Sequence, residues 1–139
     1  MARGAGFTLT EALVTVVVIG IVASIAIPSY QRTFEHAFGR ESETALRILY
    51  RAEQAYYNAK SPPSNVYGWH NVAGQGNDLA SYIPSPLDSA EWTYTAVPGN
   101  GQTPKEFTAT ATRVRGPHAG KTRTTSRTGV ISPDSWPPS

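Results

Sequence analysis

The chain of 139 residues contains no cysteine. This absence excludes a disulfide framework and any thiolate metal site. The histidines, His36, His70 and His118, are scattered and have no carboxylate at metal-ligand spacing. The sequence also shows no Ser/His/Asp arrangement and no glycine-rich phosphate loop. We therefore expect a protein that is not an enzyme and that holds neither a metal nor a cofactor.

Charge is missing from two long stretches. No Asp, Glu, Lys or Arg occurs from Ala12 to Gln31, and no Asp or Glu occurs from Phe107 to Pro133. The net charge of +2 is too small to imply a polyanionic partner by itself. The first gap is compatible with a lipid environment, and the second leaves a local excess of positive charge.

The uncharged stretch has the length of a membrane-spanning helix. Leu9 to Ile27 would form about 28 Å of α-helix, close to the thickness of a hydrocarbon core. Its valines and isoleucines fall on all sides, so burial of one face cannot cover them. Arg3 precedes the stretch and favours a cytoplasmic N-terminus. We predict a hydrophobic helix over residues 7–30 that lies in lipid or at the centre of a bundle.

Glu11 is a carboxylate at the start of this apolar segment. A charged side chain inside a membrane-spanning segment costs free energy, so a carboxylate at this position indicates a function. Thr8 and Glu11 also have the spacing of a helix capping box, and an acid suits the positive end of a helix. The sequence leaves both interpretations open.

Two features further along would affect helix packing. Gly20 and Ser24 form a small-xxx-small pair at which helices can approach closely, although such a pair also arises by chance in an Ala/Val-rich run. Pro28 lacks a backbone donor and is expected to kink or locally open the helix.

The helical pattern resumes after Pro28 and becomes amphipathic. We predict that residues 31–61 form a helix that packs on a sheet, and that Ser61-Pro62-Pro63 ends it. Glu43 and Arg47 make an i, i+4 pair on its polar side. Its apolar stripe is Ala45, Leu49, Ala52, Tyr56 and Ala59.

The rest of the chain is rich in proline and reads as short elements. Residues 62–139 hold ten of the eleven prolines. We predict a loop-rich connection over residues 62–91, with a helical turn near Leu79, and then an antiparallel sheet and tail over residues 92–139. The expected strands are 92–97, 106–114, 121–127 and 129–131.

Strict alternation defines the second of these strands. Phe107, Ala109 and Ala111 fall on one face, Arg113 follows on the same face, and threonines lie on the other. The fold class is therefore α+β, with a long kinked N-terminal helix packed on a small C-terminal antiparallel sheet. The core candidates are Trp92, Tyr94, Phe107, Val130 and Ile131.

The N-terminus resembles that of type IV pilins and of type II secretion pseudopilins. The resemblance rests on the Gly6-Phe7 junction, on Glu11 four residues after Phe7, and on Pro28 near the far end of the apolar run. It covers roughly the first 55 residues. It implies a prepilin with a class III signal sequence: prepilin peptidase removes the leader, residues 1–6, after Gly6, and Phe7 becomes N-methylated.

The resemblance also implies a lollipop-shaped structural subunit. The precursor would lie in the inner membrane, and assembly machinery there would pack copies helix-in-core into an extracellular pilus for adhesion, motility or DNA uptake. Glu11 of one copy would meet the amine of Phe7 on another, and Gly20 and Pro28 would shape the helix contacts. Many pilins close their C-terminal region with a disulfide, which this chain cannot form.

Two alternatives stay open at this point. The chain resembles secretion pseudopilins as well as pilins, and an uncleaved anchor carrying a DNA-binding strand is a different class of protein. For that strand, the interpretations are a DNA contact, a solvated face, or contact with a neighbour's Asp78, Asp88 or Glu91. The candidate polyanion contacts are Arg113, Arg115, Lys121, Arg123 and Arg127.

Overall fold

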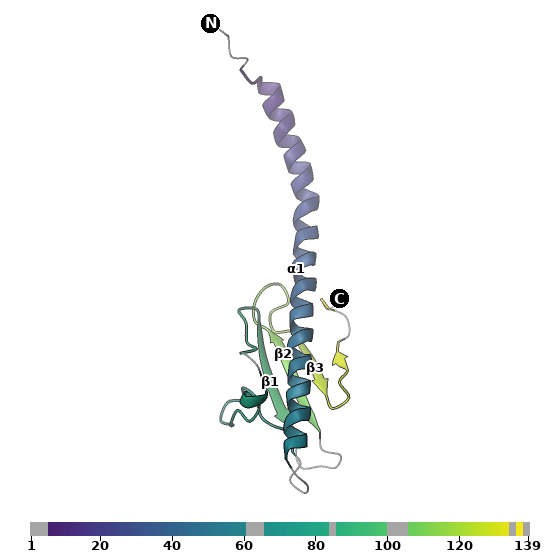
Figure 1. The fold of residues 1–139 in the computed structure, drawn as a ribbon. Helices are drawn as coiled ribbons and strands as arrows, with labels where there is room; N and C mark the ends of the chain where they lie inside the picture. The colour runs from purple at the N-terminus through teal and green to yellow at the C-terminus, as the bar shows by residue number, and fades with distance from the viewer. Residues whose placement is uncertain (1–5, 61–65, 84–85, 100–105, 134–135, 138–139) are drawn as a thin grey trace. The chain divides into compact units, whose positions relative to one another are not determined.

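The predicted α+β class is confirmed by the computed structural model, which has one long helix and one four-stranded antiparallel sheet (Figure 1). The described residues are 6–60, 66–83, 86–99, 106–133 and 136–137. Most of the leader, residues 1–5, and the predicted helix stop at Ser61-Pro62-Pro63 lie outside them. The elements are α1 (Leu9–Ala59), the 3-10 turn η1 (Ala80–Tyr82), β1 (Trp92–Pro98), β2 (Phe107–Arg113), β3 (Thr122–Ser126) and β4 (Ile131–Ser132).

The chain divides into two compact units, Met1–Glu35 and His36–Ser139. The helix α1 belongs to both units and is helical without a break across Pro28. The kink expected at Pro28 stays a prediction. The second unit contains the sheet and the apolar core, and we call it the globular unit.

Within the globular unit, α1 buries a wider face than a single stripe. The predicted positions Ala45, Leu49 and Ala52 are buried, Tyr56 is half-buried, and Ala59 is exposed at the helix end. Three further positions on neighbouring rows of the helix are also fully buried, so the contact with the sheet is broad. These are Ser42, Leu46 and Glu53.

The sheet has the order β1-β2-β3-β4, with each strand antiparallel to its neighbour. Strand alternation turns Trp92 and Tyr94 of β1, and Phe107 of β2, toward α1, as predicted. Val130 was expected in the core and is 61% exposed, because β4 begins only at Ile131 and Val130 belongs to the preceding turn.

The outer face of the sheet is a lattice of threonines. Alternation places a threonine at every second position of β2, and Thr122, Thr124 and Ser126 at those of β3, and these side chains are exposed or half-buried. The register joins Thr93, Thr112 and Thr122 in one row. The next row is Thr95, Thr110, Thr124 and Ser132. Cross-strand threonine pairs of this kind stabilise a sheet without any charged group.

The connection before β1 is tied to the sheet and to the helix. The backbone of His70 exchanges two hydrogen bonds with Ala96 of β1, at 3.1 and 3.0 Å. The Gly68 N–H donates to the buried carboxylate of Glu53 on α1 at 2.8 Å. The turn η1 confirms the helical turn predicted after Leu79.

Polar and aromatic contacts hold the C-terminal segment where a disulfide is impossible. The Arg123 guanidinium donates to the carbonyls of Gly39 and Pro133 at 2.7 and 3.3 Å, which links α1 to the segment after β4. Trp136 is buried, and its ring centroid lies 5.0 Å from that of Trp92. We call this arrangement the C-terminal clamp.

Gly39 is the part of the clamp that is most sensitive to substitution. A Cβ at Gly39 would lie 2.6 Å from Cδ1 of Trp136, closer than real contacts allow. We expect Gly39→Ala to lower the free energy of unfolding by about 1–3 kcal/mol, despite the gain of up to about 1 kcal/mol in helix propensity. Urea unfolding of the detergent-solubilised chain, followed by tryptophan fluorescence, measures this. At the control site, Gly76→Ala, the nearest atom is 3.8 Å away. Equal stability of the two variants would contradict the clamp.

Candidate functional site

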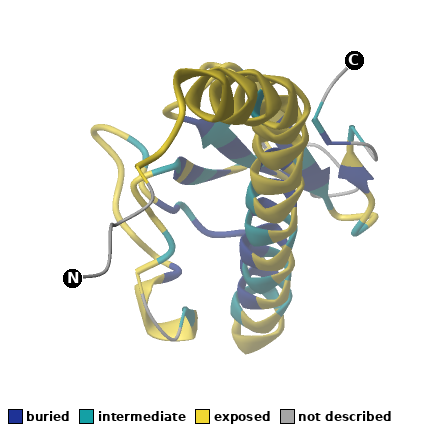
Figure 2. Cartoon of the chain, turned by 90° about the horizontal axis from the view of Figure 1, so that it is seen from above, coloured by how far each residue is buried: buried dark blue, intermediate teal, exposed yellow. Residues whose placement is uncertain are grey.

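The N-terminal unit exposes a continuous apolar surface on α1. Every large apolar residue from Phe7 to Ile27 is at least half exposed, the lowest value being 52% at Val17. In Figure 2 the exposed colour covers this part of the helix. The helix is long and apolar enough to cross a membrane, with a mean hydropathy of 2.4 over its most apolar window. Such a surface is unfavourable in contact with water, so lipid or other protein surfaces must cover it.

Glu11 and Thr8 form the capping box that their spacing allows. The backbone N–H and the hydroxyl of Thr8 both donate to Oε2 of Glu11, at 2.9 and 2.6 Å. The Glu11 N–H lies 3.3 Å from the Thr8 hydroxyl oxygen. These bonds complete the first turn of the helix. Within the part of the chain that the structure describes, hydrogen bonds reach only Oε2, so Oε1 can still accept from an outside donor.

Gly20 and Ser24 lie on an open part of the same helix. The Ser24 hydroxyl donates to the carbonyl of Ile21 at 2.7 Å, so it is satisfied within the helix. A Cβ placed on Gly20 would meet no atom within 4 Å. The fold of one copy does not require glycine there, and the two small residues leave room for a close neighbour.

The candidate polyanion patch is not assembled, because two of its five residues are inside the protein. Arg113 is 2% exposed, and its Nη1 donates to the carboxylate of Glu91 at 2.6 Å. Its guanidinium also lies 4.0 Å from the ring centroid of Phe38. Arg123 is 3% exposed and belongs to the C-terminal clamp. Both guanidinium groups are therefore engaged inside the globular unit, and a contact of these residues with a polyanion stays a prediction.

The other three cations of that set are exposed but separated. Arg115 and Lys121 flank the turn between β2 and β3, whereas Arg127 follows the far end of β3. From Lys121 to Arg127 an extended strand covers about 20 Å. The register pairs Arg123 with Ala111, which explains why Arg123 faces inward. The alternation of β2 in the sequence already predicted that Arg113 lies on the apolar face. The inward face of β3 could not be predicted in this way, because it bears too few apolar residues.

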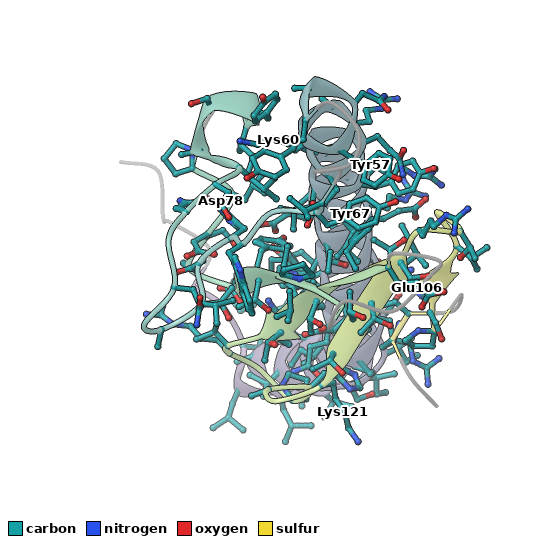
Figure 3. All side chains as sticks on the ribbon, turned by 90° about the horizontal axis from the view of Figure 1, so that it is seen from below. Tyr57, Lys60, Tyr67, Asp78, Glu106 and Lys121 are labelled. Atoms are coloured by element: carbon teal, nitrogen blue, oxygen red, sulfur yellow. The ribbon has the colours of Figure 1, made fainter. Side chains whose placement is uncertain are left out.

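Glu53 is a buried carboxyl group that the helical pattern did not indicate. Its side chain is fully buried, Oε2 accepts the Gly68 N–H, and Oε1 has no partner among the described residues. Burial, with a smaller contribution from Asp78, raises the pKa of Glu53 to about 7. Beside it, the rings of Tyr57 and Tyr67 stack at 4.9 Å (Figure 3). Burial also raises the pKa of Tyr67.

A pocket of about 410 Å³ lies beside the connection before β1. Its polar groups bond to one another: His70 Nδ1 lies 3.1 Å from Asn77 Oδ1, and Asn71 donates to Asp88 at 2.8 Å. Asp88 also accepts the backbone N–H of Tyr94 at 2.9 Å. These groups hold the connection in place. The described residues contain no group of three side chains suited to a metal ion.

Comparison with known proteins shows which family the N-terminal segment is similar to. The family described as "Prokaryotic N-terminal methylation motif" matches residues 1–27, which include the capping box and most of the exposed helix. Within that class the resemblance to type IV pilins is confirmed, and the α+β fold is pilin-like.

The chain is also similar to an individual protein over part of its length. The chain is 38% identical over 58 residues to the "Type IV major pilin protein PilA" of Myxococcus xanthus. The match covers 42% of this chain and 26% of that protein, so the chain spans about a quarter of the relative's length. No solved structure matches the chain.

Glu53 makes the stability of the globular unit depend on pH. Its pKa is raised from 4.5 to about 7 in the folded chain, so between these values the folded chain binds a proton that the unfolded chain has released. The stabilisation is complete below pH 4.5 and is lost as the pH rises through 7. We expect a loss on the order of 2 kcal/mol between pH 5 and 8, and Glu53→Gln should largely remove it.

Urea unfolding at several pH values measures this slope. Glu43→Gln is the matched control, because Glu43 is on the same helix but pairs with Arg47 at the surface, at 2.8 Å. That ion pair lowers the pKa of Glu43, so its small contribution has the opposite sign and falls at acidic pH. An unchanged slope in Glu53→Gln would assign the pH dependence to other groups.

Proposed function

We propose that this chain is the structural subunit of a type IV pilus. The single observation that carries the proposal is the exposed apolar helix headed by the Thr8–Glu11 capping box, within a segment matching the N-terminal methylation motif. Burial of that helix among copies of the chain would drive assembly. The similarity to a major pilin supports a pilus over a secretion pseudopilus.

Processing would leave the apolar helix on the mature protein. Prepilin peptidase would cut between Gly6 and Phe7, and the new terminal amine of Phe7 would be methylated. The precursor would wait in the inner membrane with residues 7–30 in lipid, and the assembly machinery would extract it into an extracellular filament. Adhesion, motility or DNA uptake would then be properties of the filament, without an enzymatic site.

Glu11 would have one role in the precursor and another in the filament. In the precursor its Oε2 caps its own helix, as the hydrogen bonds from Thr8 support. In the filament its Oε1 would accept from the Phe7 amine of a neighbour, which fixes the register of the stack. A buried ion pair of this kind contributes more to specificity than to stability, because desolvation offsets most of the attraction. The open surface at Gly20 favours the close helix approach that such stacking requires.

The anchored DNA-binding alternative loses its main support. Two of the five residues that would contact DNA are buried, and the exposed ones are at opposite ends of β3. Arg113 and Arg123 instead stabilise the globular unit through Glu91 and Gly39.

Intact mass of protein sheared from cell surfaces tests the proposal. We expect a fibre fraction containing the chain without residues 1–6 and with one added methyl group on Phe7. Full-length protein confined to the inner membrane would refute the pilus. A processed chain that gives no surface fibres but is required for export of other proteins would indicate the secretion pseudopilus.

Two substitutions at Glu11 separate its two roles. Glutamine at this position can still cap the helix, whereas alanine can neither cap nor pair. If the intersubunit ion pair operates, we expect both Glu11→Gln and Glu11→Ala to reduce fibre yield at least tenfold, since an unpaired buried amine costs several kcal/mol. The measurement is the amount of subunit in the sheared fraction relative to the membrane fraction. Normal fibres from Glu11→Gln and few from Glu11→Ala would show that capping alone matters.

A further inference from the structure

Charge is segregated across the globular unit. No Lys or Arg occurs from Ser61 to Pro104, whereas that stretch contains three acidic residues. These are Asp78, Asp88 and Glu91, of which the two aspartates are exposed. The backbone bonds of His70 to Ala96 place the segment around His70 beyond the β1 edge of the sheet. Asp78 and Asp88 accept hydrogen bonds from its residues Trp69 and Asn71. We call Asp78, Asp88 and Glu91 the acidic edge, and in Figure 3 Asp78 is well separated from Lys121.

A fourth carboxylate, Glu41 of α1, lies on the same side. Burial raises the pKa of Tyr94 on β1, and Glu41 and Asp88 both add to the shift, so both carboxylates lie near that tyrosine. The Glu41 side chain is half-buried and makes no hydrogen bond or ion pair with any described residue. The negative charge of the acidic edge is therefore only partly compensated within one copy.

The exposed face of α1 carries the opposite sign. Arg40, Arg47 and Arg51 are all exposed and lie on one helical face, which also bears the exposed Thr44. Glu43 pairs with Arg47, so the face keeps a net positive charge. Arg51 makes no hydrogen bond or ion pair with any described residue.

A groove adjoins this face on the side of the sheet away from β1. It has a volume of about 210 Å³ and lies between α1 and the β3–β4 end of the sheet. Thr125 lines it, is 3% exposed, and has a hydroxyl without a hydrogen-bond partner among the described residues. A buried hydroxyl in this state is destabilising until an acceptor reaches it. The remaining lining residues are Leu46, Arg47, Tyr50, Arg51, Gly129 and Ile131.

We propose that the Arg47–Arg51 groove of one copy receives the acidic edge of a second copy. The inference rests on the proposed filament and names the contact between globular units within it. Charge complementarity selects the occupant: the groove presents two guanidinium groups and an unpaired hydroxyl, and the acidic edge presents carboxylates that can accept from them.

The sheet order explains why such a contact would extend rather than close. The acidic edge lies beyond β1 and the groove lies beside β3 and β4, which are the two opposite sides of the sheet. A contact between two different patches is heterologous, so a pair of joined copies keeps one unused acidic edge on one copy and one unused groove on the other. Because the two patches lie on opposite sides of the sheet, repetition of this contact would add subunits in one direction, as a filament requires.

Charge reversal in the full-length chain tests the contact without disturbing the fold. Arg51 and Ala90 are both exposed, and their side chains make no hydrogen bond with a described residue. We expect Arg51→Glu and Ala90→Lys each to lower fibre yield roughly two- to fivefold, and the double variant to recover most of it. Wild-type fibres should also dissociate at high salt, because salt weakens the attraction between the groove and the acidic edge. The variant Arg115→Glu/Ala90→Gln is the control: it changes surface charge away from the groove and shows how much of the salt effect comes from such unrelated charge.

Cross-linking gives a direct readout, because the natural chain has no cysteine. Ala90→Cys marks the acidic edge, and Val130→Cys marks the rim of the groove, where Val130 is 61% exposed. The two edges of the sheet are about 14 Å apart, so a bismaleimide with a shorter spacer cannot join them within one copy. We expect a ladder of multimers from fibres of the double-cysteine chain and none from either single variant.

The outcomes separate this inference from the proposed function. Normal fibres without a cross-linked ladder, and with unchanged yield in Arg51→Glu, would overturn the contact and leave the pilus intact. Absence of fibres from the wild type would overturn the pilus itself. Salt-sensitive binding of DNA that is lost in Arg51→Glu, with fibres unaffected, would assign the groove to a polyanion and also overturn the contact.

Discussion

The structure depends on one constraint: no described part of the chain covers the apolar surface that α1 presents from Phe7 to Ile27. From Phe7 to Ile27 the large side chains point to all sides and remain exposed, and the core of the globular unit draws its α1 residues from Phe38 to Tyr57. Burying such a surface is favourable by roughly 25 cal/mol per Å², so the helix is stable only in lipid or against other helices. The capping box at Thr8 fits both environments, because it completes the helix end within one chain.

The globular unit solves a different problem, which is to close a small fold without a covalent link. It does so by burying two arginines whose partners come from distant parts of the chain. Arg113 joins β2 to Glu91, and Arg123 joins β3 to Gly39 of α1 and to Pro133. Buried charges are stable only when they are well paired, so each arginine also specifies which segments meet. Their contacts in the globular unit are structural. In the sequence, the same residues indicated a nucleic-acid surface because no acidic residue occurs among them.

The sequence predicted the parts of the fold that have a strong period. The all-round apolar helix, the stripe at Ala45, Leu49 and Ala52, and the alternation on β2 all follow from periodicity. The sequence did not reveal Glu53 as buried, since a glutamate is ordinarily solvated and only the docking of Gly68 encloses it. Val130 was misplaced because the boundary of β4 is set by the turn after β3, which carries no periodic signal. Arg123 faces inward through its pairing with Ala111, a register that no local pattern fixes.

The threonine lattice on the outer sheet face has a consequence for the surroundings of the protein. Its rows contain hydroxyl and methyl groups and no ionisable side chain among the described residues. Hydration of that face is therefore indifferent to acidity and to ionic strength, since neither changes a hydroxyl group. The arginine-bearing face of α1, by contrast, weakens its attractions as salt increases. One side of the globular unit thus keeps a constant affinity for water across changing environments, while the other responds to them.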